Sequence, residues 1–304
     1  MLSLVSCLGI NPNYQGLFLF LFSLYEEVYY EQDNIKFRKH KNLELNLFTY
    51  YIKFNSEKIK LRRLIMKVYV VANLKGGVGK TTTTVNVAYT FSEMGGRVLV
   101  IDLDPQCNCT RFFAKVNGYS KTVREVLENP KAINSTVYRT KYQDIDIVKG
   151  SVKITEQKTP WRLKEALGYL KKDYDVCLID TRPVFDMLTM NALYAADVFL
   201  TPVKFDNFCR DNLTMVEDAY HEILENNPDL EWKIFANMVS NTKAQKLSSE
   251  DLIAKHDYPF LQSCISRTAI VDNALSLYKP VAKHRVMSNV AQDFVDLVEE
   301  LLED

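Results

Sequence analysis

The sequence predicts an α/β fold with a doubly wound, mostly parallel sheet flanked by helices, and three observations support this. Short apolar, β-branched runs recur along the chain, and each is followed by a helical pattern. The runs are continuously hydrophobic, as expected for parallel strands that are covered on both faces. A glycine-rich turn joins the first run to the first helix. Such strand-helix repetition is typical of open parallel sheets. The predicted strands are residues 67–73, 97–103, 145–149, 174–180, 197–203 and 232–238.

Composition excludes several classes of protein. The 304 residues are 47% hydrophobic and 25% charged, which excludes a disordered or collagen-like chain. Lys plus Arg equal Asp plus Glu at 38 each, so any contact with nucleic acid or membrane must come from a local patch. No apolar run reaches the length of about 18 residues that a transmembrane helix needs. The six cysteines are scattered, which indicates a reducing, cytoplasmic setting without a disulfide framework.

The first 65 residues differ from the rest of the chain, since aromatic residues crowd there and glycine is scarce. The apolar run at 17–24 lacks a basic segment before it and a cleavage site after it, so a signal peptide is not predicted. At Met66 a strand runs directly into a glycine loop. We therefore predict an extension over residues 1–65, accessory or mis-called, and an α/β domain over 66–304, with Met66 as the preferred translation start. A native peptide containing Tyr29 and Tyr30 would contradict that start.

The first predicted strand ends at the turn Leu74-Lys75-Gly76-Gly77-Val78-Gly79-Lys80-Thr81-Thr82. A glycine turn between a strand and a helix points successive backbone N–H groups inward, and the helix N-terminus adds partial positive charge. The alternative is a loop that only turns the chain. The pattern predicts that Lys80 binds the β- and γ-phosphates of a nucleotide and that the hydroxyl of Thr81 coordinates Mg²⁺. The predicted nucleotide-binding residues are Gly76, Gly77, Val78, Gly79, Lys80, Thr81 and Thr82.

Carboxylates mark two further strand ends. Asp102 and Asp104 are two residues apart, so on one strand they face the same side and can both address a nucleotide and its metal. The alternative is that they cap the strand and open the next loop. The apolar run Val176–Ile179 ends in Asp180, a Walker B arrangement in which the carboxylate holds Mg²⁺ through a water molecule.

The motif KGGVGKTT resembles the deviant Walker A motif of the ParA/MinD family of P-loop ATPases. It has Leu74 where the ordinary motif has glycine, and it carries the additional Lys75. The resemblance implies ATP and Mg²⁺ as cofactors and a homodimer when ATP is bound, in which Lys75 reaches the phosphates of the partner's ATP. The segment at 102–106 is similar to the family's DxDPQ, which implies that Asp104 positions the attacking water and that Asp102 supports the metal's water shell. Lys75, Lys80 and Asp104 are thus the predicted catalytic residues.

Three positions depart from the family pattern or match it weakly. Cys107 stands where relatives have glycine, which puts the local loop conformation in question because a Cβ disfavours positive φ. Arg182 interrupts the family's proline pair, and phosphate contact, dimer pairing and solvent exposure are all open for it. Asn237 falls where relatives place an adenine-contacting residue, although asparagine at a strand end is commonly a turn former.

The C-terminal part, from Ser266 onward, is similar to the end of ParA/Soj-type chromosome and plasmid partition ATPases. The resemblance implies a slow, partner-stimulated ATPase that is cytoplasmic and nucleoid-associated, and it implies a ParB-like centromere-binding partner. It also implies salt-sensitive, nonspecific DNA binding. The alternative is that the basic residues of this part are ordinary solvated charges at helix ends. The local basic cluster consists of Arg267, Lys279, Lys283, His284 and Arg285.

Two other functions stay open. One is a nucleotide-gated binding module with little turnover, and the other is a MinD-like ATPase that associates with membrane. The last segment, 289–304, is amphipathic, but its polar face is acidic and anionic lipids repel it. We therefore expect this segment to pack on the domain and expect no stable membrane insertion.

Overall fold

The structure, a computed structural model, describes residues 28–31, 34–37, 66–115, 120–154, 157–206, 208–240 and 257–303, together with 242, 245, 249 and 252. The chain divides into two compact units, Met1–Phe54 and Asn55–Asp304. In the first unit the described part is an antiparallel hairpin of β1 (Val28–Glu31) and β2 (Asn34–Phe37), which sequence reasoning did not predict. The predicted boundary at 65/66 and the start at Met66 stay predictions.

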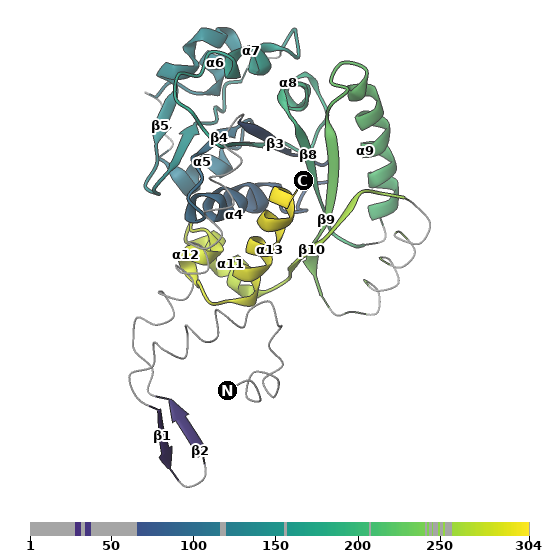
Figure 1. Cartoon of the computed structure of the whole chain (residues 1–304). Helices are drawn as coiled ribbons and strands as arrows, with labels where there is room; N and C mark the ends of the chain where they lie inside the picture. Colours follow the sequence, from purple (N-terminus) through teal and green to yellow (C-terminus); the bar gives the residue numbers. More distant parts are fainter. Residues whose placement is uncertain are drawn as a thin grey trace. The chain divides into compact units, whose positions relative to one another are not determined.

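The second unit contains an eight-stranded sheet flanked by helices, which confirms the predicted fold class (Figure 1). Its strands are β3 (Lys67–Val71), β4 (Val98–Asp102), β5 (Val137–Arg139), β6 (Ile145–Val148), β7 (Val176–Asp180), β8 (Val198–Val203), β9 (Glu231–Val239) and β10 (Phe260–Ser266). Its helices are α4 (Lys80–Glu93), α5 (Asn108–Phe113), α6 (Val123–Glu128), the 3-10 helix η2 (Pro130–Ser135), α7 (Arg162–Leu167), α8 (Met187–Ala195), α9 (Cys209–Leu224), α11 (Ala269–Ser276), α12 (Val281–His284) and α13 (Asn289–Glu303).

The strand order is β10-β9-β8-β3-β7-β4-β6-β5, with every pairing parallel except that of β5 with β6. All six predicted strands are present. The sequence did not reveal the two edge strands. β5 has only three residues, and β10 has a single buried residue, Ile265, and an irregular register. The three strands that carry the predicted motifs, β3, β7 and β4, are immediate neighbours, so their carboxyl ends meet at one place.

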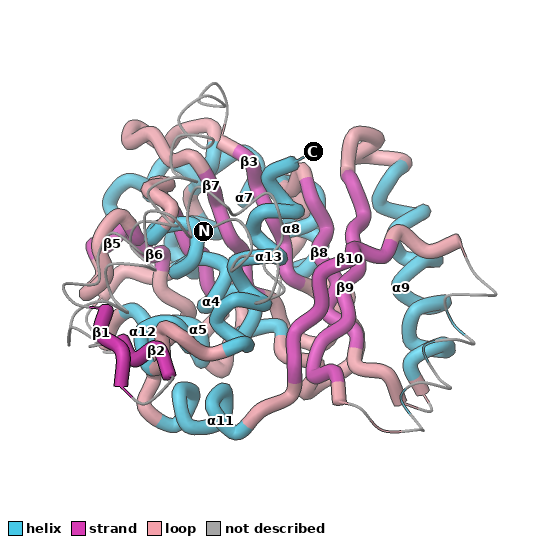
Figure 2. Tube along the Cα trace, turned by 60° about the horizontal axis from the view of Figure 1, so that its bottom comes forward, coloured by secondary structure: helices cyan, strands magenta, loops and turns pink. Residues whose placement is uncertain are grey.

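Helices cover both faces of the sheet, which explains why the central strands are buried along their whole length (Figure 2). Alternate residues of a strand serve opposite faces. On β3, Val68 and Val70 join the cluster formed with α6, α7, α8 and α9. Tyr69 faces the other layer, where its ring lies 5.9 Å from that of Phe91 in α4 and its hydroxyl donates to the Leu301 carbonyl in α13 at 3.1 Å.

The C-terminal helix α13 packs on the domain, as predicted. Its apolar side, from Val290 to Leu301, is buried, and it contacts α4 and β10. Glu300 accepts hydrogen bonds from the backbone N–H groups of Gln262 and Ser263, and Asp293 accepts one from Ser266. The acidic face of α13 therefore binds the backbone of the edge strand β10. Among the helices that the structure describes, none is both long and apolar enough to cross a bilayer.

Candidate functional site

The glycine loop before α4 has the backbone that its sequence predicts. Gly77 and Gly79 have φ values of +73° and +94°, in the left-handed region that residues with a Cβ avoid. Gly79 is the N-cap of α4, and its carbonyl accepts the Thr83 N–H at 2.8 Å. A Cβ on Gly79 would lie 2.3 Å from Asn237 Nδ2, whereas one on Gly76 or Gly77 would meet nothing within 4 Å. The loop is thus closed toward β9 and open on its other side.

We expect Gly79→Ala to destabilise the nucleotide-free protein by about 1–3 kcal/mol, because it forces both a positive φ and a clash with Asn237. Chemical denaturation measures the loss. Gly76→Ala is the matched control, since that position has neither problem, and its unfolding free energy should stay within about 0.5 kcal/mol of wild type. Equal effects of the two substitutions would contradict this account of the loop.

Lys80, the first residue of α4, lies over the loop. Its side chain is buried, and its Nζ donates to the carbonyls of Asn73 at 3.1 Å and Lys75 at 2.9 Å. Burial lowers the pKa of Lys80, and the neighbouring charges of Asp180 and Asp104 act in the opposite direction. The structure thus brings the ammonium near two of the three predicted carboxylates, those of Asp180 and Asp104, at the carboxyl edge of the sheet.

Asp180 and Asp102 end β7 and β4 and are register partners, so two carboxylates stand side by side, both fully buried. The Oδ2 of Asp180 accepts from the Thr81 hydroxyl at 2.7 Å, and its Oδ1 accepts from Thr84 at 3.3 Å. Burial, together with the charge of Asp102, raises the pKa of Asp180 well above its usual range. Burial likewise raises the pKa of Asp102 to about 6, against the hydrogen bonds from Thr110.

These groups fit a hard divalent cation. Hydroxyl and carboxylate oxygens are the ligands that Mg²⁺ prefers, and a cation would favour the ionised carboxylates that burial and the neighbouring negative charges disfavour. Thr81 and Asp180, which are in direct hydrogen-bond contact, are the residues that would hold it. The carboxylate of Asp102 already accepts three hydrogen bonds from the protein: from Thr110 N at 2.8 Å, from Thr110 Oγ1 at 2.6 Å and from Asp104 N at 3.1 Å.

The placement of Asp104 corrects one expectation. β4 ends at Asp102, so the two aspartates do not share a strand face as predicted. Asp104 lies in the loop that follows, where its Oδ1 accepts the Gln106 N–H at 2.9 Å. The alternative, in which the aspartates cap the strand and open the next loop, is thus partly correct, because Asp102 accepts a hydrogen bond from the Asp104 N–H of this loop. The half-buried Asp104 remains near enough to influence Lys80 and Asp180 electrostatically.

The three departures from the family pattern have structural outcomes. Cys107 adopts φ +53°, so the turn keeps the left-handed conformation despite the Cβ. Arg182 forms an ion pair with Asp186, the N-cap of α8. Asn237 is buried and donates to the Val78 carbonyl at 2.7 Å. Its amide therefore supports the glycine loop, and a contact between Asn237 and adenine stays a prediction.

Sequence reasoning missed a second group at the same edge. Asn73, the residue before Leu74, accepts from the Lys75 N–H and from Asn212 Nδ2 of α9, both at 2.8 Å. The Lys75 ammonium contacts the carboxylate of Asp206, which precedes α9. The tripeptide Lys204-Phe205-Asp206 gave no signal for this contact because its partner is 131 positions away in sequence.

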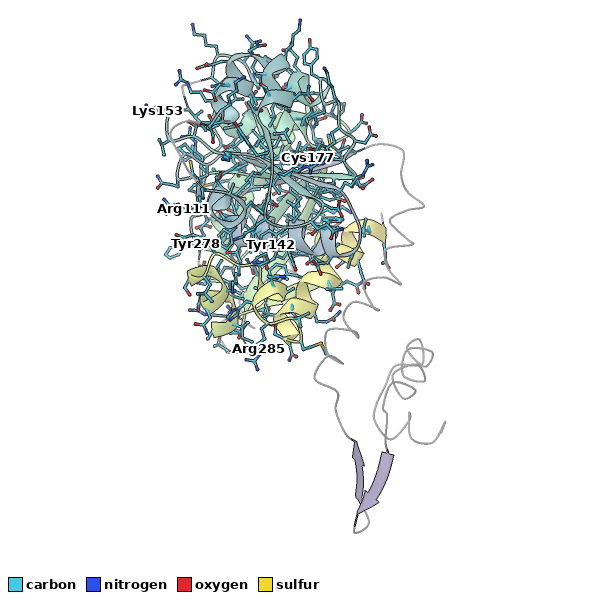
Figure 3. All side chains as sticks on the ribbon, turned by 90° about the vertical axis from the view of Figure 1, so that its left-hand side faces the viewer. Arg111, Tyr142, Lys153, Cys177, Tyr278 and Arg285 are labelled. Atoms are coloured by element: carbon cyan, nitrogen blue, oxygen red, sulfur yellow. The ribbon has the colours of Figure 1, made fainter. Side chains whose placement is uncertain are left out.

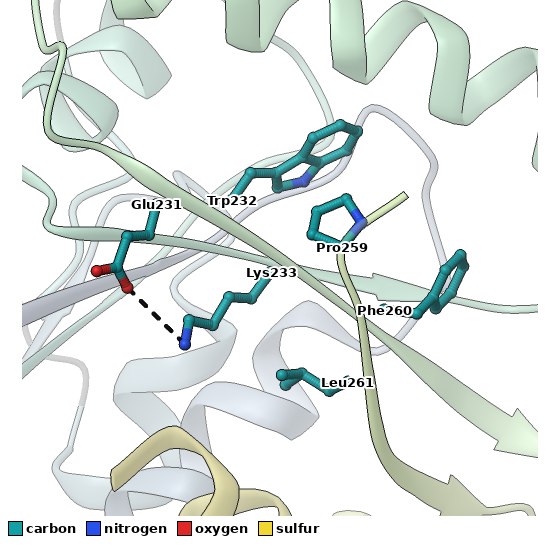
Figure 4. Close-up of a pocket in the computed structure, with 6 residues that line it drawn as sticks. All are labelled: Glu231, Trp232, Lys233, Pro259, Phe260 and Leu261. Carbon is teal, nitrogen blue, oxygen red and sulfur yellow. Dashed lines mark ion pairs between the residues drawn. The ribbon is translucent and has the colours of Figure 1, made fainter. Parts of the chain in front are cut away.

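Among the residues that the structure describes, two pockets lie at opposite ends of the strands. One of about 370 Å³ is next to the Asp104 loop and is lined by Pro105, Ile154, Gln157, Arg182, Asp186, Met187 and Leu188. A larger, open one of about 510 Å³ lies where β9 and β10 begin, at the edge opposite the glycine loop (Figure 4). There Glu231 and Lys233 pair at 3.8 Å among Trp232, Pro259, Phe260 and Leu261. The motif residues converge only at the first edge.

The predicted basic residues lie elsewhere, around α11 and α12. Arg267, Lys279, Lys283 and Arg285 are all exposed. Two further cations from distant segments join them through Tyr278: Arg111 of α5 donates to its hydroxyl at 3.5 Å, and Lys141 donates to its carbonyl at 3.4 Å. The sequence could not show these two residues because they belong to other parts of the chain.

Comparison with known proteins agrees with this geometry. A family profile described as "AAA domain" matches residues 66–234. The chromosome partitioning protein ParA of Myxococcus xanthus is 25% identical over 248 residues, covering 78% of this chain and 88% of that protein. The sporulation initiation inhibitor protein Soj of Bacillus subtilis is 26% identical, covering 77% of this chain and 98% of that protein.

A solved structure shares the fold. Cobyrinic acid a,c-diamide synthase of Mycobacterium smegmatis, with bound ADP and magnesium, superposes with a TM-score of 0.68 at 25% identity and covers 79% of this chain and 95% of its own. The family profile spans more than half of the 304 residues, and it begins at the strand that leads into the glycine loop. The chain belongs to this family, the P-loop ATPases of the ParA/MinD type.

Proposed function

We propose that the protein is an ATP-dependent dimerising ATPase of the ParA type that acts in plasmid or chromosome partitioning. The observation that carries this proposal is the convergence, at the ends of three adjacent strands, of the glycine loop, buried Lys80, the Thr81–Asp180 pair and the Asp104 loop. The similarity to ParA and Soj supports the partition role.

Each residue at this edge has a distinct task in the proposal. Backbone N–H groups of Gly76 to Thr82 bind the phosphates, and Lys80 neutralises their charge. Thr81 and Asp180 would hold magnesium, which would supply positive charge to the phosphate oxygens. Asp104, half-buried on a loop that Asp102 fastens, orients the attacking water.

Lys75 completes the site from a second subunit in this proposal. Its side chain is about one-quarter exposed, at the rim of the loop, and it is not used to bind the subunit's own loop carbonyls as Lys80 is. A monomer should therefore bind ATP and hydrolyse it slowly, because positive charge supplied at the transferred phosphate is a large part of phosphoryl-transfer catalysis.

The alternative is a nucleotide-gated module with little turnover. Phosphate release measured with and without nonspecific DNA, and with a ParB-like partner, separates the two. Turnover that DNA and the partner stimulate supports the ATPase. If ATP binds and dimerises the protein but no phosphate is released under any of these conditions, the module is correct and the ATPase proposal fails.

We place nonspecific DNA on the basic surface, defined as Arg111, Lys141, Arg267, Lys279, Lys283 and Arg285. Figure 3 shows Arg111 near Tyr278, with Arg285 farther down, at the lower end of the domain in this view. Burial, together with the charge of Lys279, lowers the pKa of Lys141, so like charges gather there. Phosphates would relieve that repulsion. With this surface we propose a cytoplasmic, nucleoid-associated protein; the membrane alternative is not favoured because the apolar side of α13 is buried.

We expect Lys279→Glu to weaken binding to nonspecific duplex DNA and to reduce the slope of log affinity against log salt by about one. Fluorescence anisotropy of a labelled duplex across a salt series measures both. Lys131→Glu is the matched control, since Lys131 is also exposed but lies on η2, outside the basic surface. Equal loss in the two variants would indicate a bulk-charge effect and contradict the placement.

A further inference from the structure

Tyr278, just after α11, has a backbone conformation that is unusual for its residue type. Its φ is +48°, and among the residues that the structure describes it is the only aromatic one with a positive φ. The Tyr278 N–H donates to the Leu275 carbonyl, and the Lys279 N–H donates to the Ala274 carbonyl, both at 3.0 Å. This is the hydrogen-bond pattern of a helix end whose left-handed residue is usually glycine. A tyrosine there strains the backbone, and residues held in such strain cluster at functional sites.

Tyr278 is exposed, yet it is held in place. The residue is 42% exposed, and its ring packs edge-on against that of Phe112 in α5, with 5.5 Å between the ring centroids. The chain just after it is fixed as well, because the Val281 N–H donates to the Oδ1 of buried Asn86 in α4 at 2.7 Å. The hydroxyl therefore has a defined position on the surface and loses little freedom when it binds a ligand.

Positive charge gathers around this tyrosine from distant segments. Arg111 Nη1 donates to the Tyr278 hydroxyl at 3.5 Å (Figure 3), and Lys141 Nζ donates to the Tyr278 carbonyl at 3.4 Å. Burial lowers the pKa of Lys141, and the charge of Lys279 lowers it further. Within the described ranges of the chain, none of these three cations forms an ion pair with a carboxylate.

The Tyr278 hydroxyl still has its own proton to donate. Its oxygen accepts from Arg111, and within the described part of the chain its O–H donates to no other group. The Arg111 guanidinium has five N–H donors, of which this contact uses one. The two side chains therefore present several donors side by side, which suits an anion with more than one acceptor oxygen.

We propose that the Tyr278 hydroxyl contacts the DNA backbone and donates to the same phosphate that Arg111 binds. This inference rests on the proposed function. Lys141 and Lys279 supply the surrounding positive charge. A phosphate contact positions the duplex and carries no sequence information, as nonspecific binding requires. We assign the phosphate to DNA and not to a lipid headgroup, because the amphipathic helix α13 buries its apolar side in the domain.

Tyr278→Phe removes the hydroxyl and keeps the ring that packs on Phe112. We expect the full chain, with Mg²⁺ and a non-hydrolysable ATP analogue, to bind a labelled duplex about three- to ten-fold more weakly, because one hydrogen bond to a charged group is lost. The slope of log affinity against log salt should keep its wild-type value, since the hydroxyl is neutral and releases no counterion. This combination separates the hydroxyl from the lysines of the surface, whose loss changes the slope. Fluorescence anisotropy across a salt series measures both quantities.

Tyr169→Phe is the matched control. Tyr169 is 39% exposed, and Lys131 lies 5.7 Å from its ring, but both residues lie outside the basic surface. The variant loses the same hydroxyl beside a cation and should bind the duplex as wild type does. If Tyr278→Phe binds as tightly as Tyr169→Phe, the inference is overturned.

A double-mutant cycle tests whether Tyr278 and Arg111 share one phosphate. In an Arg111→Ala background, Tyr278→Phe should weaken binding by less than two-fold, because the hydroxyl has lost the group that shares its ligand. An equal loss in both backgrounds would show that the two side chains act independently and would overturn the shared contact.

Two further outcomes identify what has failed. Vesicles of phosphatidylglycerol give the lipid arm: if Tyr278→Phe weakens binding to them and leaves duplex binding unchanged, the phosphate is that of a lipid and the inference is overturned. If Lys279→Glu weakens duplex binding and Tyr278→Phe does not, the inference fails and the proposed DNA surface stands. If wild-type protein does not bind the duplex, the DNA surface of the proposed function fails, and the inference fails with it.

Discussion

Lys80→Ala should lower the affinity for Mg²⁺-ATP by about 100-fold or more, because charge-assisted hydrogen bonds to phosphate are worth about 1.5–3 kcal/mol each. Lys80 is buried, and the charges of Asp180 and Asp104 favour its charged form. The substitution leaves two loop carbonyls, those of Asn73 and Lys75, without this donor. Isothermal titration calorimetry with Mg²⁺-ATP measures the loss.

The matched control is Lys67→Ala. Lys67 begins β3, at the opposite end of the strand that leads into the glycine loop, and it pairs with Glu231 at 3.5 Å. Its removal deletes the same charge at a position outside the glycine loop, and it should leave ATP affinity within about two-fold of wild type. If Lys80→Ala binds ATP as tightly as Lys67→Ala does, the loop does not bind the triphosphate in the way proposed.

Asp104→Ala should reduce ATP turnover by about 10²- to 10⁴-fold while the protein still binds ATP and dimerises. Asp104 lies on a loop and not in the strand, and its side chain accepts one hydrogen bond, from the Gln106 N–H in the same loop. Its removal should therefore leave the fold intact, and the ATP-bound dimer should accumulate. Phosphate release and size-exclusion chromatography after addition of ATP measure the two effects.

Asp102→Ala serves as the contrast. Asp102 is fully buried and accepts three hydrogen bonds, one from Asp104 in the loop and two from Thr110 in α5. Its loss should therefore lower the unfolding free energy by several kcal/mol, as when a buried polar network is broken. Asp104→Ala should melt close to wild type. A destabilised Asp104→Ala, or one with full turnover, would contradict the assignment of the attacking water to this residue.

The sequence predicted those parts of the site that a single short motif specifies. The glycine loop is specified by its own residues, since Gly77 and Gly79 need positive φ. Asp102 and Asp180 are recognisable because an apolar strand precedes each of them. Their meeting also follows from the rule that ligands lie at the carboxyl ends of parallel strands.

Contacts between distant segments lay beyond the sequence. Asp206 and Lys75 are 131 positions apart, and Arg111 and Tyr278 are 167 apart, and no motif links the two members of either pair. The exact end of β4 was also missed, because Leu103 continues the apolar pattern after the strand pairing has stopped. The edge strands were not predicted, because β5 is only three residues long and β10 is mostly exposed or partly exposed.

A mixing experiment tests the composite site most directly. Lys75→Ala lacks the lysine that acts in trans, and Asp104→Ala lacks the water-positioning acid, so each homodimer should be nearly inactive. In a mixed dimer, the Lys75→Ala subunit keeps Lys80 and Asp104 and receives Lys75 from its partner. Equal amounts should therefore recover about one quarter of wild-type phosphate release, from one complete site in half of the dimers. Recovery would establish that Lys75 serves the neighbouring subunit, and a mixture as inactive as its two components would contradict that claim.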